Sequence, residues 1–122
     1  MWHETAWRQR GQASVELVAL LPLVVLLGAV VVQVGLAAHA WGAARDAARA
    51  GARAHMVGAP ARDAARRVLG ASLGRDATVT VRRRPDGSER IDVKVRVPML
   101  LPWVPAARVA SDVPVPSDAQ GA

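Results

Sequence analysis

The sequence lacks cysteine, phenylalanine and tyrosine altogether. Without cysteine the chain has no disulfide framework, no thiolate metal site and no cysteine nucleophile. Without phenylalanine and tyrosine it has no aromatic-packed core, so we expect helices rich in alanine, valine and leucine. Histidine is also scarce, and His3, His39 and His55 do not show the i, i+4 spacing typical of a zinc site. We therefore expect no metal and no cofactor.

Motifs for catalysis are missing as well. None of the serines lies in a nucleophile motif, and no glycine-rich loop is present that would hold a phosphate. The sequence therefore predicts neither an enzyme nor a small-molecule substrate.

The charge is strongly biased toward one sign and one residue type. The net charge is +6, and Lys94 is the single lysine among 16 basic residues. A nucleic-acid partner would require aromatic platforms or a recognisable binding module, and the sequence has neither. The codon bias of a GC-rich genome explains much of this arginine, and any functional part suits anionic lipid headgroups or an acidic partner.

A long apolar run lies near the N-terminus. From Leu17 to Ala38 the chain has no charge and one polar side chain, Gln33. As a helix this run is about 33 Å long, enough to cross a hydrocarbon layer of roughly 30 Å. It contains Pro22, Gly28 and Gly35, which membrane helices tolerate. The run predicts a transmembrane helix over residues 12–40, in which Pro22 provides a kink and the two glycines allow close helix packing.

The pattern changes after the membrane helix. Residues 41–57 are rich in alanine, and Arg45, Arg49 and Arg53 are spaced by four. This pattern predicts that the helix continues beyond the membrane, with Trp41 at the membrane–water interface. Gly58-Ala59-Pro60 interrupts this helix, and a second, short helix is expected from residue 61. Valine then alternates with polar residues on both sides of Pro85-Asp86-Gly87-Ser88, which predicts a two-stranded antiparallel hairpin.

These elements indicate an α+β fold. A lone hairpin is only marginally stable, so we expect the second helix to pack on it and to form a small domain over residues 61–98. Residues 99–122 are rich in proline, and we expect a C-terminal arm that is partly disordered.

The junction before the membrane helix is the most informative segment. It reads Arg10-Gly11-Gln12-Ala13-Ser14-Val15-Glu16, so a single carboxylate stands five residues after a glycine and directly before the apolar run. A charged side chain costs roughly 2.5–3.5 kcal/mol at the centre of a membrane and less near its surface. Glu16 is therefore either a solvated residue at the membrane surface or a residue with a partner.

The segment RGQASVELVALLPLVVLL resembles the N-terminus of class III prepilins, specifically of TadE-like pilus assembly proteins. Gly11 corresponds to the cleavage glycine of these proteins, Glu16 to their glutamate and Pro22 to the proline in their helix. Leu17 stands where the family commonly has phenylalanine or tyrosine. The alanine- and arginine-rich stretch after the apolar run is also similar to that of the family.

The resemblance implies that a prepilin peptidase cuts between Gly11 and Gln12. The leader, residues 1–11, would be cytoplasmic and the C-terminal domain extracytoplasmic, whereas the arginines on both sides of the run leave the orientation open. Glu16 would pair with the new α-amine of a neighbouring subunit and set the register of assembly. The partners would be pilin-like subunits and the platform proteins of a tight-adherence (Flp-type) pilus or a related secretion apparatus. Because major Flp pilins are considerably shorter, the resemblance favours a minor pilin or pseudopilin.

Two alternatives remain open from the residues alone. Ala38-His39-Ala40 has the small-x-small pattern of a signal-peptide site, so the chain could be a soluble exported protein cut after Ala40. It could also be an unprocessed single-span membrane protein that binds other proteins.

Overall fold

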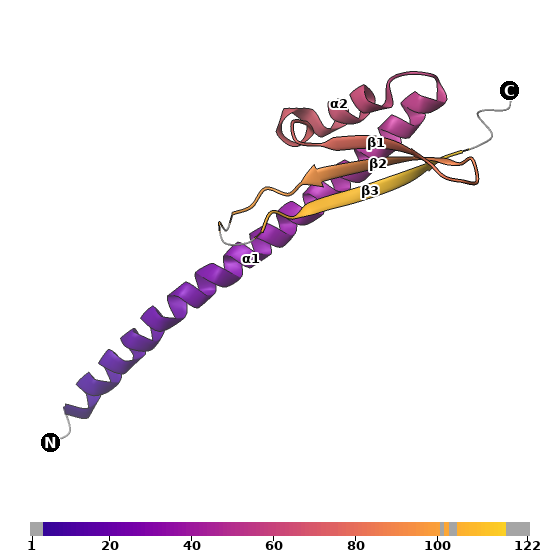
Figure 1. Ribbon diagram of the computed structural model, residues 1–122. Coiled ribbons are helices and arrows are strands. Elements are labelled where there is room, and N and C mark those ends of the chain that lie inside the picture. The colour runs from indigo at the N-terminus through magenta and orange to yellow at the C-terminus, as the bar shows by residue number, and fades with distance from the viewer. Residues whose placement is uncertain (1–3, 101, 103–104, 117–122) are drawn as a thin grey trace. The chain divides into compact units, whose positions relative to one another are not determined.

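The computed structural model describes residues 4–100, 102 and 105–116, with side chains from Ser14 onward. In chain order the elements are α1 (Glu4–Met56), α2 (Ala61–Gly74), β1 (Thr78–Arg83), β2 (Glu89–Arg96) and β3 (Arg108–Val115) (Figure 1). The α+β class predicted from the sequence is confirmed. The chain divides into two compact units, Met1–Val34 and Gly35–Ala122, and α1 supplies residues to both.

The described part of the first unit is helical throughout. Its large apolar side chains are all exposed from Val15 to Val34, and α1 continues through Pro22. A helix that is apolar on every side cannot bury a single stripe against a core, and such a helix is typical of a membrane span. Within the part of the chain that the structure describes, α1 is the one helix long and apolar enough to cross a membrane.

The second unit has a core built from small helical and β-branched strand residues. Five alanines form one buried face of α1, and four residues of β2 and its C-terminal extension are fully buried opposite them. These residues are Ala40, Ala44, Ala47, Ala48 and Ala52 on α1, and Ile91, Val93, Val95 and Val97 on the strand. Because alanine side chains are short, the helix backbone can lie close to the sheet.

Helix α2 covers part of the same core. Ala61, Ala65 and Leu69 are buried on one face, as expected for a helix that packs on the hairpin. The backbone of Gly70 has φ +68°, outside the helical region, so α2 contains a break at this glycine.

The sheet has three antiparallel strands in the order β1-β2-β3, where the sequence predicted two. The third strand, β3, comes from the proline-rich segment for which we expected an extended arm. It pairs with β2 along its whole length, from Glu89 opposite Val115 to Arg96 opposite Arg108. The disordered tip expected at the C-terminus falls on residues 117–122, outside the described residues.

The position of Pro114 in the register is compatible with a strand, although proline is unusual within one. The Val97 amide donates to the Ala107 carbonyl at 3.0 Å, and the register extends this hydrogen-bonded pairing to every second residue. Pro114, opposite Arg90, falls between the hydrogen-bonded pairs, so its nitrogen faces the outer edge of the sheet. Proline is tolerated there because no ladder hydrogen bond is lost.

Candidate functional site

The proposed processing site lies within α1. The helix begins at Glu4, so Gly11 and Gln12 both have helical backbone, together with the described part of the expected leader. The side chains of residues 4–13 are outside the described set.

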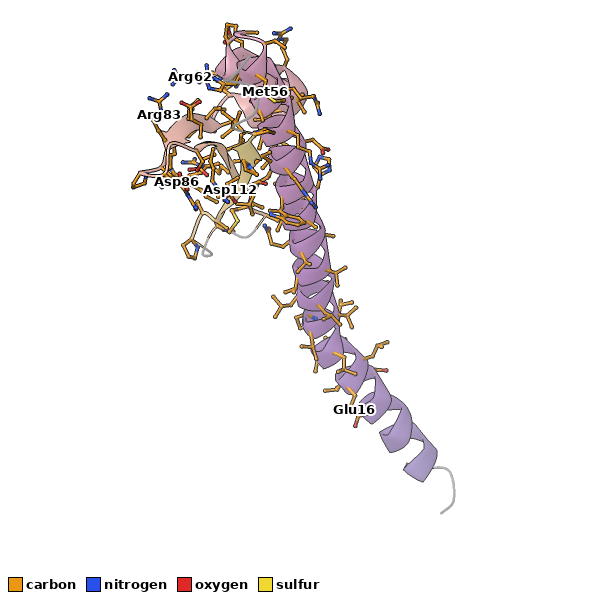
Figure 2. The ribbon with its side chains drawn as sticks, turned by 90° about the vertical axis from the view of Figure 1, so that its right-hand side faces the viewer. Glu16, Met56, Arg62, Arg83, Asp86 and Asp112 are labelled. Atoms are coloured by element: carbon orange, nitrogen blue, oxygen red, sulfur yellow. The ribbon has the colours of Figure 1, made fainter. Side chains whose placement is uncertain are left out.

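Glu16 lies on α1 directly before the apolar run. Its side chain is exposed, and Figure 2 shows it pointing away from the helix axis. Among the described side chains, Glu16 forms no ion pair and no hydrogen bond. The carboxylate is therefore accessible to a group outside the described chain.

The two glycines of the apolar run lie in open surroundings. A Cβ atom added at Gly28 or at Gly35 would have no heavy atom within 4 Å. Seven residues advance a helix by almost two turns, so both glycines lie on nearly the same side of α1. All of the predicted site residues lie along this single helix, so their arrangement follows from the helix itself and not from tertiary packing.

A charged cluster that the sequence did not reveal lies at the far end of α1. The His55 Nε2 atom is 2.6 Å from Glu89 Oε2, while Arg83 donates to Glu89 Oε1 from Nε at 3.1 Å and from Nη2 at 2.8 Å. The side chain of Glu89 is only 10% exposed. The three residues come from α1, β1 and β2, so the cluster joins the end of α1 to the end of the sheet where the turn connects β1 to β2.

The environment of Glu89 favours its charged form. The hydrogen bond with His55 is the largest cause that lowers the pKa of Glu89, followed by the hydrogen bond from Arg83, and partial burial opposes both. Glu89 follows the pattern of the inward face of β2, where it is the one acidic residue among valine and isoleucine. A lone carboxylate at an inward position of a strand is the signal by which the sequence could have indicated a buried ion pair.

The turn between β1 and β2 has the chemistry predicted from the sequence. Ser88 donates to Asp86 Oδ1 from its backbone N at 2.9 Å and from its hydroxyl at 2.7 Å, and Gly87 has φ +83°. The hydroxyl hydrogen bond, followed by the amide hydrogen bond, lowers the pKa of Asp86. These contacts stabilise a turn and leave Asp86 with a structural role.

The outward face of the sheet is charged, and its two ends differ. Near the turn, Arg82 Nε lies 2.7 Å from Asp92 Oδ2, and Arg90 forms an ion pair with Asp112. Farther along, Lys94, Arg96 and Arg108 are exposed and form no ion pair with a described residue. Within the described ranges, no group of three His, Cys, Asp or Glu side chains could hold a metal ion.

The comparisons agree with the resemblance found in the sequence. Residues 11–53 match the model of a family described as TadE-like protein, which confirms the resemblance for these residues. The matched part begins at Gly11 and covers the apolar run and the arginine-containing extension of α1. No curated protein and no solved structure matches the chain.

Proposed function

With the TadE-like character of residues 11–53 as the premise, we propose that the chain is a minor pilin or pseudopilin. In this proposal it is a membrane-anchored structural subunit of a tight-adherence (Flp-type) pilus assembly or a related secretion apparatus. The observation that carries the proposal is the spacing of Gly11 and Glu16 at the start of an apolar helix. The family match and α1 by themselves indicate a Tad pilus-related protein with a membrane-type helix.

The proposal includes processing by a prepilin peptidase between Gly11 and Gln12. The leader then lies on the cytoplasmic side and the α+β domain on the extracytoplasmic side. The start of the family match at Gly11 supports this junction. The match also continues through Ala40 to residue 53, which favours a mature chain that keeps α1 from Gln12 onward over an exported protein cut after Ala40.

Glu16 is the residue that we propose for register. Its exposed carboxylate directly precedes the apolar run, and burying it is costly unless a cation accompanies it. A cut before Gln12 creates a cationic α-amine, and pairing with this amine of a neighbouring subunit offsets the cost. Gly28 and Gly35 provide an open side of α1 on which a second helix can pack.

N-terminal sequencing of the protein isolated from membranes tests the processing step. The proposal expects Gln12 as the first residue, whereas Trp41 indicates a signal peptide and Met1 indicates an unprocessed anchor. Gly11→Val should block the cut and increase the mass of the isolated chain. Gly28→Val, the same substitution in the apolar run, is the matched control and should be processed normally. An unchanged mass for Gly11→Val overturns the proposal.

Substitution of Glu16 tests the assembly step separately. Glu16→Gln keeps the size of the side chain and removes its charge, so membrane insertion should be unchanged while co-purification with pilin-like subunits falls at least tenfold. Asp46→Asn removes an exposed carboxylate elsewhere on α1 and should have no effect. Normal incorporation of Glu16→Gln contradicts the pairing.

A further inference from the structure

Strand β2 runs antiparallel to the C-terminal half of α1. At one end Glu89 contacts His55, and two residues later the Ile91 Cγ2 atom lies 3.1 Å from the point that a Cβ atom added to Gly51 would occupy. From Ile91 to Val97 the strand advances about 20 Å, the rise of about thirteen helical residues. The end of β2 therefore lies at the level of Leu36 to Ala40, and Leu36 and Ala37 pack against the core that contains Val97.

This level coincides with the end of the apolar run at Ala38. The next turns of α1 carry Trp41 and Arg45, both exposed, and the Arg45 guanidinium carbon lies 5.8 Å from the centre of the Trp41 ring. Tryptophan and arginine side chains with an apolar body and a polar tip are typical of the membrane–water interface.

The same end of the sheet presents an unusual pair of like charges. Arg96 lies directly opposite Arg108 in a position without ladder hydrogen bonds, where Cβ atoms are about 4.5–5.5 Å apart. Lys94 is the next residue along the same face. The sequence has no Asp or Glu between Val93 and Ser111, so the chain segment that carries these cations supplies no counter-ion. Like charges directly opposite each other destabilise a sheet unless an anion accompanies them.

The connection between the two arginines is apolar and uncharged. Its sequence, from Pro98 to Ala107, contains no charged residue. Leu100 is 53% exposed and Pro102 is exposed as well. Exposed apolar residues flanked by cations are the combination that binds to the boundary between lipid headgroups and acyl chains.

We infer that Arg96, Leu100 and Arg108, which flank the end of β2 and the start of β3, dock on the membrane that α1 enters. Leu100 lies at the acyl boundary, and Arg96 and Arg108 bind the phosphates of anionic headgroups. The domain thereby has a second membrane contact besides α1. The inference rests on the proposed anchoring of α1, and it extends that proposal from the helix to the folded domain.

Single-cysteine labelling of the full chain tests this contact, because the chain has no other cysteine. Leu100→Cys, Ala59→Cys and Val25→Cys are each labelled with the fluorophore NBD and reconstituted in phosphatidylcholine vesicles with about one third phosphatidylglycerol. Ala59 is exposed at the turn beyond the far end of α1 and serves as the aqueous control, while Val25 reports insertion of the span. We expect nitroxide lipids to quench the Leu100 label at least threefold more than the Ala59 label.

Charge reversal then tests the arginines. Arg96→Glu with Arg108→Glu should abolish the excess quenching of the Leu100 label. Arg62→Glu with Arg66→Glu is an equal change of charge on exposed positions of α2 and should leave the quenching unchanged.

Quenching at Leu100 equal to that at Ala59 overturns the inference. Quenching that varies with the protein-to-lipid ratio also overturns it, because it indicates contact with another copy of the chain. If the Leu100 label is not quenched but the Val25 label lies in lipid, the docking is wrong and the membrane anchoring by α1 is retained. A Val25 label in water overturns the anchoring itself.

Discussion

Gly51 and Gly42 lie on the same half of α1 and have opposite surroundings. A Cβ atom at Gly51 would lie 3.1 Å from Ile91 Cγ2 and 3.2 Å from the Ala61 carbonyl oxygen, whereas a Cβ atom at Gly42 would meet nothing within 4 Å. The helix backbone therefore touches both β2 and the start of α2 at Gly51. No positive φ is involved, so the requirement for glycine at this position is one of space.

We expect Gly51→Val to lower the free energy of unfolding of the domain by about 1–3 kcal/mol, because the added atoms overpack the contact with Ile91 and Ala61. Gly42→Ala should raise it by up to about 1 kcal/mol through helix propensity. Hydrogen exchange of β2 amides in the micelle-bound full chain measures both effects. Equal protection in the two variants would contradict the close approach at Gly51.

Glu89 gives the domain a dependence on pH whose sign follows from its contacts. Because His55 and Arg83 lower the pKa of Glu89 in the folded state, the ionised carboxylate stabilises the fold above the pKa of the unfolded chain, about 4.3. This contribution is lost as the pH falls through the lower pKa of the folded state. Asp86 has a lowered pKa too and contributes in the same direction.

Glu89→Gln should therefore lower the midpoint of thermal unfolding at pH 7 and reduce the loss of stability between about pH 5 and pH 3. Some dependence should remain because Asp86 is still present. Circular dichroism of the full chain in micelles measures the midpoints, and Asp46→Asn is the exposed control. A Glu89→Gln chain with the slope of the unmodified protein would show that the cluster with His55 does not stabilise the fold.

At the scale of elements, β2 is the strand on which the domain is organised. It pairs with β1 on one side and β3 on the other, and its inward residues Ile91, Val93 and Val95 are fully buried. Val81 lies opposite Ile91 on β1 and faces the same way, but it is 46% exposed, whereas Val79 on the same strand is buried. Val81 and Ile91 are therefore paired in the same register but contribute differently to the stability of the domain.

Ile91→Ala should lower the free energy of unfolding by about 2–5 kcal/mol, since it leaves a cavity beside α1. Val81→Ala should cost about 1 kcal/mol or less, because half of its surface is already in water. The exchange rates of β3 amides hydrogen-bonded to β2 report both variants. Similar losses for the two substitutions would mean that Val81 is covered to the same degree as Ile91.

At the scale of the whole molecule, the two units obey different rules of burial. Every large apolar side chain described in the first unit is exposed, from Val15 to Val34, whereas the second unit has an alanine–valine core of its own. The first unit therefore requires an apolar environment outside the chain. The second unit can bury its apolar residues by folding.

The double substitution Leu26→Arg with Val30→Arg should release the chain from the membrane fraction, because each charge at the centre of a span costs about 2.5–3.5 kcal/mol. Resistance to carbonate extraction measures the effect. Val57→Arg is the matched control, because Val57 is 80% exposed and lies outside the span. This variant should remain with the membranes. Carbonate-resistant association of the double variant would contradict a membrane span.

The sequence by itself determined the features that depend on neighbouring residues. The apolar run, the break at residues 58–60, the Pro-Asp-Gly-Ser turn and the TadE-like junction each lie within one short segment. Local patterns of hydropathy and backbone preference indicate such features directly. The α+β class followed from them, since a helix and a hairpin with one apolar face each must pack together.

Only the tertiary structure decided which distant segments meet. The strand character of β3, with Ser111 facing inward and Pro114 within the strand, depends on the open edge of β2 that it covers. The cluster of His55, Arg83 and Glu89 and the close approach at Gly51 likewise join residues far apart in the chain. The physical reason is that these contacts are selected by burial and pairing in three dimensions, on which the local sequence carries no direct information.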